Sequence, residues 1–126
     1  MKKYELNVFF KSILDCDEAP IVVCDLEHIV VYINPAAAIN YRKYEGFAVG
    51  KSIFDCHNER SCDMIKKVVK WFGESNENNK VHTFFNEKLQ KDVYMVALRD
   101  ENGSLIGYYE KHEVRMKDAT PLYQMP

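Results

Sequence analysis

The last third of the chain constrains the fold more than any other part, because it contains three consecutive segments with the composition of β-strands. These segments cover residues 81–87, 93–99 and 105–114, and all three are rich in Val, Tyr, Phe and Thr. A turn that contains Asn102 and Gly103 separates the second from the third, and Asn-Gly is the strongest short-range signal for a β-hairpin. We therefore expect a group of three strands here.

A second strand group is expected near the N-terminus. Residues 20–26 and 28–33 form two short apolar runs dominated by Val, Ile and Tyr, with the tight connection of a hairpin around residues 25–27. Asn34 and Pro35 follow, and Asn is a good helix cap while Pro fits the first helical position. The three alanines after Pro35 then favour a helix.

Two further segments carry apolar residues at the spacing of an amphipathic helix. One extends from Tyr4 to about residue 14, with a stripe formed by Leu6, Phe9, Phe10, Ile13 and Leu14. The other extends from about residue 61 to residue 73, with a stripe formed by Ile65, Val68, Val69 and Phe72. Ser61 is the expected N-terminal cap of this second helix, and Gly73 is its expected end.

The order of these elements predicts an α+β fold, in which two antiparallel strand groups flank a helical middle. The two groups can join into one five-stranded antiparallel sheet with the helices on one face, plus an N-terminal amphipathic helix. A pocket between sheet and helices is natural in that arrangement. The expected organisation is an N-terminal helix over residues 1–18, one domain over residues 19–115, and an extended tail over residues 116–126.

The overall composition limits the functions that the chain can have. Its 126 residues suit one compact domain, and its net charge of −2 argues against the basic surface that binds nucleic acids. No apolar run has the length needed to span a bilayer, and the polar and acidic residues near Met1 do not resemble a signal peptide. We therefore expect a cytoplasmic protein with no membrane contact, whose four cysteines are reduced thiols.

Three segments of the sequence resemble the PAS family of sensor domains. Residues 30–37 (VVYINPAA) resemble its second strand and following helix, and residues 49–53 (VGKSI) resemble its glycine-containing segment before the long helix. Residues 98–107 (LRDENGSLIG) resemble the hairpin that joins its last two strands. Residues 50–61 are also similar to the Cys-His-bearing segment of a PAS subgroup that is attached to small bacterial domains of unknown function and to hemerythrin-like domains.

The resemblance implies a sensor and dimerisation module of signal transduction, with a role such as transcription regulation, rather than an enzyme. A small ligand would bind between the sheet and the helices, and the signal would pass to a partner by association. Two alternatives stay open. One is a haem- or metal-binding redox or gas sensor that uses Cys56, His57 or Cys62, and the other is an interaction module without a ligand.

The sharpest signal for a site is the run Asp55-Cys56-His57, followed by Cys62. A Cys beside a His can be a metal-ligand pair, a reactive thiol or a haem contact, whereas the structural alternative is a tight turn with a buried Cys. The candidate pocket residues are Cys56, His57, Cys62, Asn34, Trp71 and Tyr94. Asn34 could instead serve as a helix cap. Trp71 and Tyr94 could instead be ordinary packing residues.

The identity of a cofactor is left open by the sequence. Cys56, His57 and Cys62 match no standard zinc pattern. Haem-binding PAS domains use a His early in the long helix, and this chain has Cys62 near that position, so haem would need Cys62 or His57 as its ligand. Flavin is disfavoured, because residues 51–54 lack the Asn-Cys-Arg motif of the light-sensing branch and Cys56 comes too late.

No motif for hydrolytic catalysis is present, since the sequence has no nucleophile elbow, phosphate loop or paired carboxylates. The first helix instead predicts an association surface, because a lone amphipathic helix must bury its apolar face somewhere. A second copy of the chain would cover that face in a homodimer, and packing against its own sheet is the alternative. The candidate interface residues are Leu6, Phe9, Phe10, Ile13 and Leu14.

Overall fold

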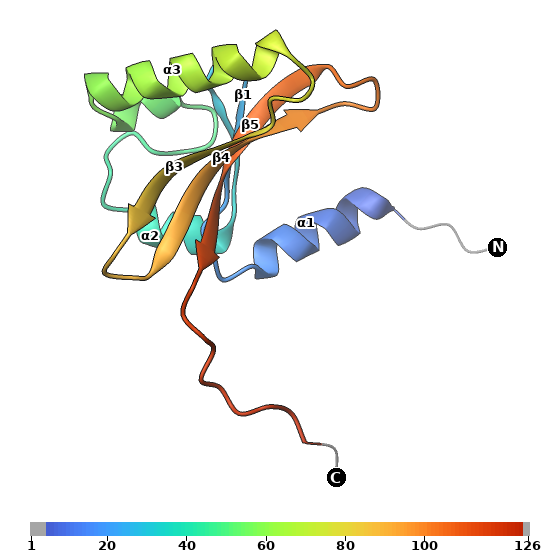
Figure 1. Cartoon of the computed structure of the whole chain (residues 1–126), viewed down its shortest axis with the longest axis vertical. Coiled ribbons are helices and arrows are strands. Elements are labelled where there is room, and N and C mark those ends of the chain that lie inside the picture. The colour runs from blue at the N-terminus through green and yellow to red at the C-terminus, as the bar shows by residue number, and fades with distance from the viewer. Residues whose placement is uncertain (1–4, 125–126) are drawn as a thin grey trace, which may run out of the picture.

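One antiparallel sheet forms the centre of the molecule (Figure 1). The computed structural model describes residues 5–124, and its five strands have the order β2-β1-β5-β4-β3. Every neighbouring pair is antiparallel. The strands are β1 (Val22–Asp25), β2 (Val30–Ile33), β3 (Lys80–Asn86), β4 (Lys91–Arg99) and β5 (Leu105–Val114). The α+β fold with a five-stranded antiparallel sheet, which the sequence predicts, is therefore confirmed.

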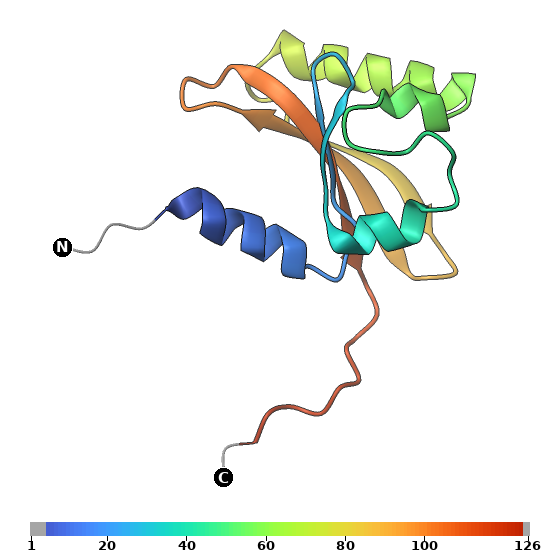
Figure 2. The same cartoon turned by 180° about the vertical axis from the view of Figure 1, so that it is seen from behind.

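The helices lie before and between the two strand groups. They are α1 (Leu6–Cys16), α2 (Pro35–Tyr41), the short 3₁₀ helix η1 (Ile53–Cys56) and α3 (Glu59–Glu74). Ala37 of α2, Ile53 of η1 and Phe72 of α3 belong to one buried cluster with the sheet residues Val22 and Met95. These helices therefore cover the same face of the sheet (Figure 2). Within residues 5–124, no helix combines the length and the apolar character needed to cross a membrane.

Three helix boundaries differ from the predicted ones, and one of them is the end of α3, which lies at Glu74 rather than at Gly73. Helix α3 begins at Glu59 rather than near residue 61, because Asn58 is the cap and its side chain accepts a hydrogen bond from the Ser61 amide at 2.8 Å. The prediction of Ser61 as the cap was wrong because the first turn of α3 is polar and carries no apolar periodicity. Helix α1 continues through Cys16, and its predicted start at Tyr4 lies outside the described residues.

Helix α1 projects from the domain and is not part of its core (Figures 1 and 2). None of its described residues is buried. It is joined to the sheet through its C-terminal end, where the hydroxyl of Tyr32 on β2 donates a hydrogen bond to the carboxylate of Asp15. The apolar side of α1 is therefore not used to stabilise this domain.

The tight pairing of β1 with β5 requires a glycine at position 107. A Cβ atom at Gly107 would lie 2.3 Å from the backbone oxygen of Cys24, which is closer than real Cβ contacts allow. We expect Gly107→Ala to push the two strands apart and to lower the free energy of unfolding by about 3 kcal/mol. Urea unfolding followed by circular dichroism measures this loss.

The matched control for this substitution is Gly73→Ala. Gly73 lies in α3, and no atom lies within 4 Å of the position that its Cβ would take. Because Ala is a better helix former than Gly, Gly73→Ala should stabilise the protein by up to about 1 kcal/mol. Equal effects of the two substitutions would contradict the close approach of β1 and β5.

Candidate functional site

A cavity of about 330 Å³ lies between the sheet and its covering helices. Strands β1, β4 and β5 form one wall, and the opposite wall comes from α2 with the loop after it, from η1 and from α3. The lining residues are Val22, Cys24, Tyr41, Tyr44, Phe47, Ile53, Cys56, His57, Asn58, Ser61, Ile65, Met95, Tyr108 and Glu110. A cavity of this size fits a small organic molecule.

The walls of the cavity are mainly apolar, and its polar groups come from few positions. Ile65 and Met95 are buried residues of the hydrophobic core, and they face the cavity from α3 and β4. His57 and Asn58 are exposed to solvent and also line the cavity. The cavity therefore opens to solvent at the junction of η1 with α3.

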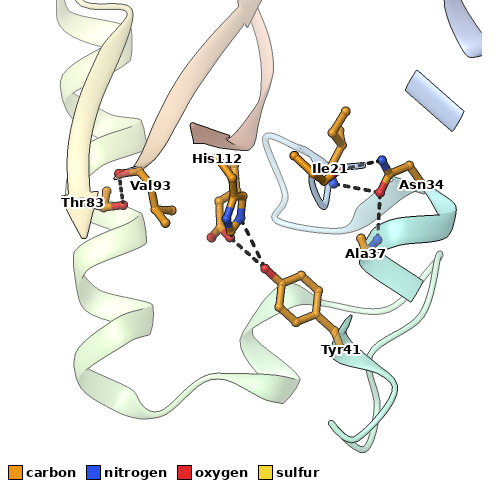
Figure 3. A network of polar contacts seen from close by, with 9 residues as sticks. Ile21, Asn34, Ala37, Tyr41, Thr83, Val93 and His112 are labelled. Carbon is orange, nitrogen blue, oxygen red and sulfur yellow. Dashed lines mark hydrogen bonds and ion pairs between the residues drawn. The ribbon is translucent and has the colours of Figure 1, made fainter. Parts of the chain in front are cut away.

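The strongest polar group in the cavity wall is the carboxylate of Glu110 on β5. Its Oε1 lies 2.7 Å from Nε2 of His112 and 3.1 Å from the hydroxyl of Tyr41. Figure 3 shows how Tyr41 points from α2 toward His112. Among residues 5–124, no side chain or amide donates a hydrogen bond to Oε2 of Glu110.

Glu110 is ionised near neutral pH. Burial raises the pKa of this carboxyl, but the hydrogen bonds from His112 and Tyr41 and the nearby imidazoles outweigh burial and leave the pKa below its ordinary value. An ionised carboxylate only accepts hydrogen bonds, so Nε2 of His112 is the donor in this contact. Nδ1 of the same ring is buried and has no hydrogen-bond partner among the described residues.

Three aromatic rings form a group around Tyr41, whose hydroxyl contacts this carboxylate. The ring centroid of Tyr41 lies 5.4 Å from that of Phe47, edge to face, and 6.2 Å from that of Tyr44. All three rings line the cavity. Burial and the charge of Glu110 raise the pKa of Tyr41, so its hydroxyl stays protonated and remains a donor.

The structure brings two of the predicted pocket residues to the cavity, Cys56 and His57. Burial raises the pKa of the Cys56 thiol, and the Cys56 Sγ donates to the backbone oxygen of Ile53 at 3.3 Å. Desolvation lowers the pKa of His57, while the charge of Glu110 opposes this shift. At neutral pH, His57 is therefore a neutral imidazole and Cys56 a protonated thiol.

The other predicted pocket residues do not line the cavity. The Cys62 Sγ lies against the backbone oxygens of Phe54 and His57, and Trp71 is 40% exposed on α3. Tyr94 lies beside His82 and beneath the ammonium of Lys80, and its hydroxyl accepts a hydrogen bond from Arg115. On β4 its neighbours Val93 and Met95 are buried, so Tyr94 points to the opposite face of the sheet.

Asn34 is also absent from the cavity lining, because its side chain is used as a structural junction (Figure 3). It is fully buried, and its Oδ1 accepts hydrogen bonds from the amides of Ile21 and Ala37, both at 2.9 Å. Its Nδ2 donates to the backbone oxygens of Leu14, Asp17 and Ala19. Its predicted role as cap of α2 is confirmed.

Sequence reasoning missed Glu110 and Tyr41, which supply two of the polar groups in the cavity wall. Glu110 belongs to the alternating series Tyr108, Glu110 and His112 on β5, so a polar series on the inward face was a usable signal. Tyr41 is the last residue of α2, and its neighbours in sequence form no pattern that indicates a binding site. Only the tertiary structure, in which the end of α2 lies near β5, brings the two side chains together.

The cysteines differ in their predicted reactivity. Cys24 is 2% exposed, and burial raises its pKa to about 11, whereas Cys16 is exposed. A pKa two units above the ordinary value lowers the thiolate fraction about 100-fold near pH 8. We therefore expect iodoacetamide to label Cys16 at least ~100-fold faster than Cys24, as measured by peptide mass spectrometry.

Concentrated urea is the control for this labelling, because both thiols should then react at similar rates. A Cys24 that reacts as fast as Cys16 in the folded protein would contradict the buried position of its thiol.

No cluster that could hold a metal ion through three or more His, Cys, Asp or Glu residues occurs in the described part of the chain. Of the two residues named for haem, His57 lines the cavity and Cys62 does not. A neutral imidazole is the form that binds iron. His57 is therefore the residue of this pair that could hold an iron in the cavity, whereas the Cys56 thiol, which also lines it, has a pKa raised by burial.

The fold and this cavity can be compared with known proteins. No protein-family model matches the sequence, and neither does any curated protein. Among solved structures, the C-terminal domain of a protein from Streptococcus mutans has a TM-score of 0.67 at 23% identity, and the match covers 90% of each chain. The PAS domain of a protein from Colwellia psychrerythraea has a TM-score of 0.63 at 16% identity, covering 87% of this chain and 97% of that one.

A further match is the PAS domain of BvgS from Bordetella pertussis, with a TM-score of 0.62 at 14% identity, covering 92% of this chain and 90% of that one. Likeness over most of both chains at such low identity establishes the architecture and not the ligand. The same architecture was expected from the segments around Asn34, Gly50 and Gly103. The chain is therefore a PAS-fold domain, with the architecture of many sensory and signalling modules.

Proposed function

We propose that this PAS-fold domain is a non-catalytic sensor that binds a small ligand in the cavity between its sheet and helices. The observation that carries the proposal is the cavity itself, in which apolar walls surround a few convergent polar groups on Glu110, Tyr41 and His57. This combination is typical of ligand sites. Cys56 and His57 both line the cavity, but the Cys56 Sγ donates to the backbone oxygen of Ile53, and burial raises the pKa of this thiol, which favours binding over catalysis.

The contacts of Asn34 support a route from the cavity to α1. Tyr41 is in the cavity wall at the end of α2, and Asn34 caps the other end of the same helix. Asn34 also holds the backbone oxygens of Leu14 and Asp17, which lie at the exit of α1. A ligand that moves α2 would change the contacts of Asn34 and so shift the balance between two arrangements of α1. A partner bound to α1 would respond to that shift.

Native mass spectrometry of the freshly purified protein tests ligand binding. We expect a co-purified mass that is lost when Ser61, which lines the cavity, is replaced in Ser61→Phe. The control is Asp63→Phe, since Asp63 is exposed on the next turn of α3 and does not line the cavity. A protein that carries no added mass and binds no small molecule would instead be an interaction module without a ligand.

The apolar side of α1 supports a homodimer as the way in which the signal is passed on. Leu6 is 60% exposed, Phe10 57% and Ile13 65%, and none of them is buried by the described chain. Analytical ultracentrifugation should show a dimer that Ile13→Glu weakens. The control Lys11→Glu changes an exposed charge on the same helix and should leave the dimer intact, whereas a monomer at high concentration would overturn the proposal.

A haem-binding sensor is the second candidate, and the observation that favours it is the neutral His57 imidazole at the cavity. Haem added to the purified protein should then give a Soret band that His57→Ala abolishes and Cys62→Ser does not. The absence of a Soret band would rule this candidate out and leave the small-ligand proposal in place.

A further inference from the structure

We infer that the cavity selects a small organic cation, namely a protonated amine on an apolar body. This inference rests on the proposed ligand-binding function and adds the chemical class of the ligand. It starts from the charges around the cavity. Of the residues that the structure describes, Glu110 is the only charged one that lines it apart from the titratable His57, and no described Lys or Arg does so.

Part of the accessible surface of Glu110 faces this cavity. Some 39% of the Glu110 side chain is accessible to solvent, and burial of the carboxyl group is the largest of the effects on its pKa. Glu110 is one of the residues that line the cavity, so part of this accessible surface faces it. Both protein donors, His112 and Tyr41, contact the same oxygen, Oε1. Oε2 is left to accept a hydrogen bond from a ligand.

The aromatic group around Tyr41 favours the same ligand chemistry. The faces of aromatic rings attract cations, and ammonium groups are bound in proteins by several rings together. The hydroxyl of Tyr41 contacts the carboxylate, and the rings of Tyr44 and Phe47 lie near the Tyr41 ring and line the same cavity. A ligand carboxylate or phosphate would find no opposite charge there and would be repelled by Glu110.

The remaining wall fits the body of the ligand. Val22, Ile65 and Met95 present apolar surface from β1, α3 and β4. An aromatic or branched aliphatic group packed there would leave the ammonium group near Glu110. The proposed ligand class is therefore an amphiphilic amine small enough for a cavity of about 330 Å³.

Three probes with the same phenylethyl body test this inference: 2-phenylethylammonium, the neutral 2-phenylethanol and the anionic 3-phenylpropionate. Binding is measured by methyl NMR, in which the signals of Ile65 and Met95 report occupancy of the cavity. We expect the amine to bind about tenfold or more tightly than the alcohol, and the carboxylate to bind least. This comparison uses the unaltered protein, so its outcome does not depend on whether a variant folds correctly.

The variant Glu110→Gln should remove the preference for the amine, so that the amine and the alcohol bind with similar affinities. Glu113→Gln is the control, because Glu113 pairs with Lys111 and Arg115 and does not line the cavity. Equal binding of amine and alcohol would overturn the inference and leave the ligand-binding function intact. Failure of all three probes to shift the Ile65 and Met95 signals at millimolar concentration would overturn both.

Discussion

Replacing Phe72 by alanine should lower the free energy of unfolding by about 3–5 kcal/mol, the largest loss expected for a single side chain in this domain. Phe72 on α3 has no accessible surface and packs within the cluster that joins the helices to the sheet. The substitution removes the packing of the ring and leaves a cavity that the surrounding strands cannot fill. Domains of this size have a total stability of about 5–15 kcal/mol, so this single substitution would remove a large share of it.

The adjacent residue provides the control for Phe72→Ala. Trp71 is on the same turn of α3 but is 40% exposed, so Trp71→Ala should cost at most about 1 kcal/mol. Urea unfolding followed by circular dichroism at 222 nm compares the two variants without relying on tryptophan fluorescence. Similar losses for both would show that α3 is not packed through Phe72.

Asn34→Ala is expected to have the second largest effect, a loss of about 2–4 kcal/mol. The amides of Ile21 and Ala37 would lose their acceptor, and the backbone oxygens of Leu14 and Ala19 would lose a donor. The junction is buried, so water cannot replace these bonds without opening the structure. Denaturant unfolding measures the loss, and hydrogen exchange at Ile21 and Ala37 should become faster.

Asn86→Ala is the matched control for this junction. Asn86 also accepts a hydrogen bond from a backbone amide, that of Leu89, but it does so at an exposed turn. Its replacement should therefore cost about 1 kcal/mol or less. If Asn34→Ala were as mild as Asn86→Ala, the connection of α1 to β1 and α2 through Asn34 would be excluded as a route for a signal.

Local signals in the sequence predicted most of the fold. The Asn102-Gly103 turn lies between β4 and β5, and the strand predicted over residues 105–114 has these bounds in the structure. Asn34 with Pro35 begins α2 as expected. These features depend on neighbours a few residues apart, so the backbone preferences of single residues suffice to indicate them. The start of α3 was misplaced because its polar first turn carries no such signal.

The candidate site could be predicted only in part. Cys56 and His57 were found because an adjacent Cys and His is unusual, and both line the cavity. Trp71 and Tyr94 were chosen for their chemistry, but the direction of a side chain is set by its place on the helix or strand. Trp71 is on the exposed side of α3, and Tyr94 is on the sheet face opposite the cavity.

The sequence by itself therefore determined the order of helices and strands, the resemblance to PAS domains and the cap at Asn34. The tertiary structure alone decided that Glu110 and Tyr41, which are 69 positions apart, meet in the wall of one cavity. Such a meeting depends on where the end of α2 lies relative to β5, and that position is set by the packing of the whole core rather than by any local pattern. The chemistry of the cavity follows from this contact between distant residues.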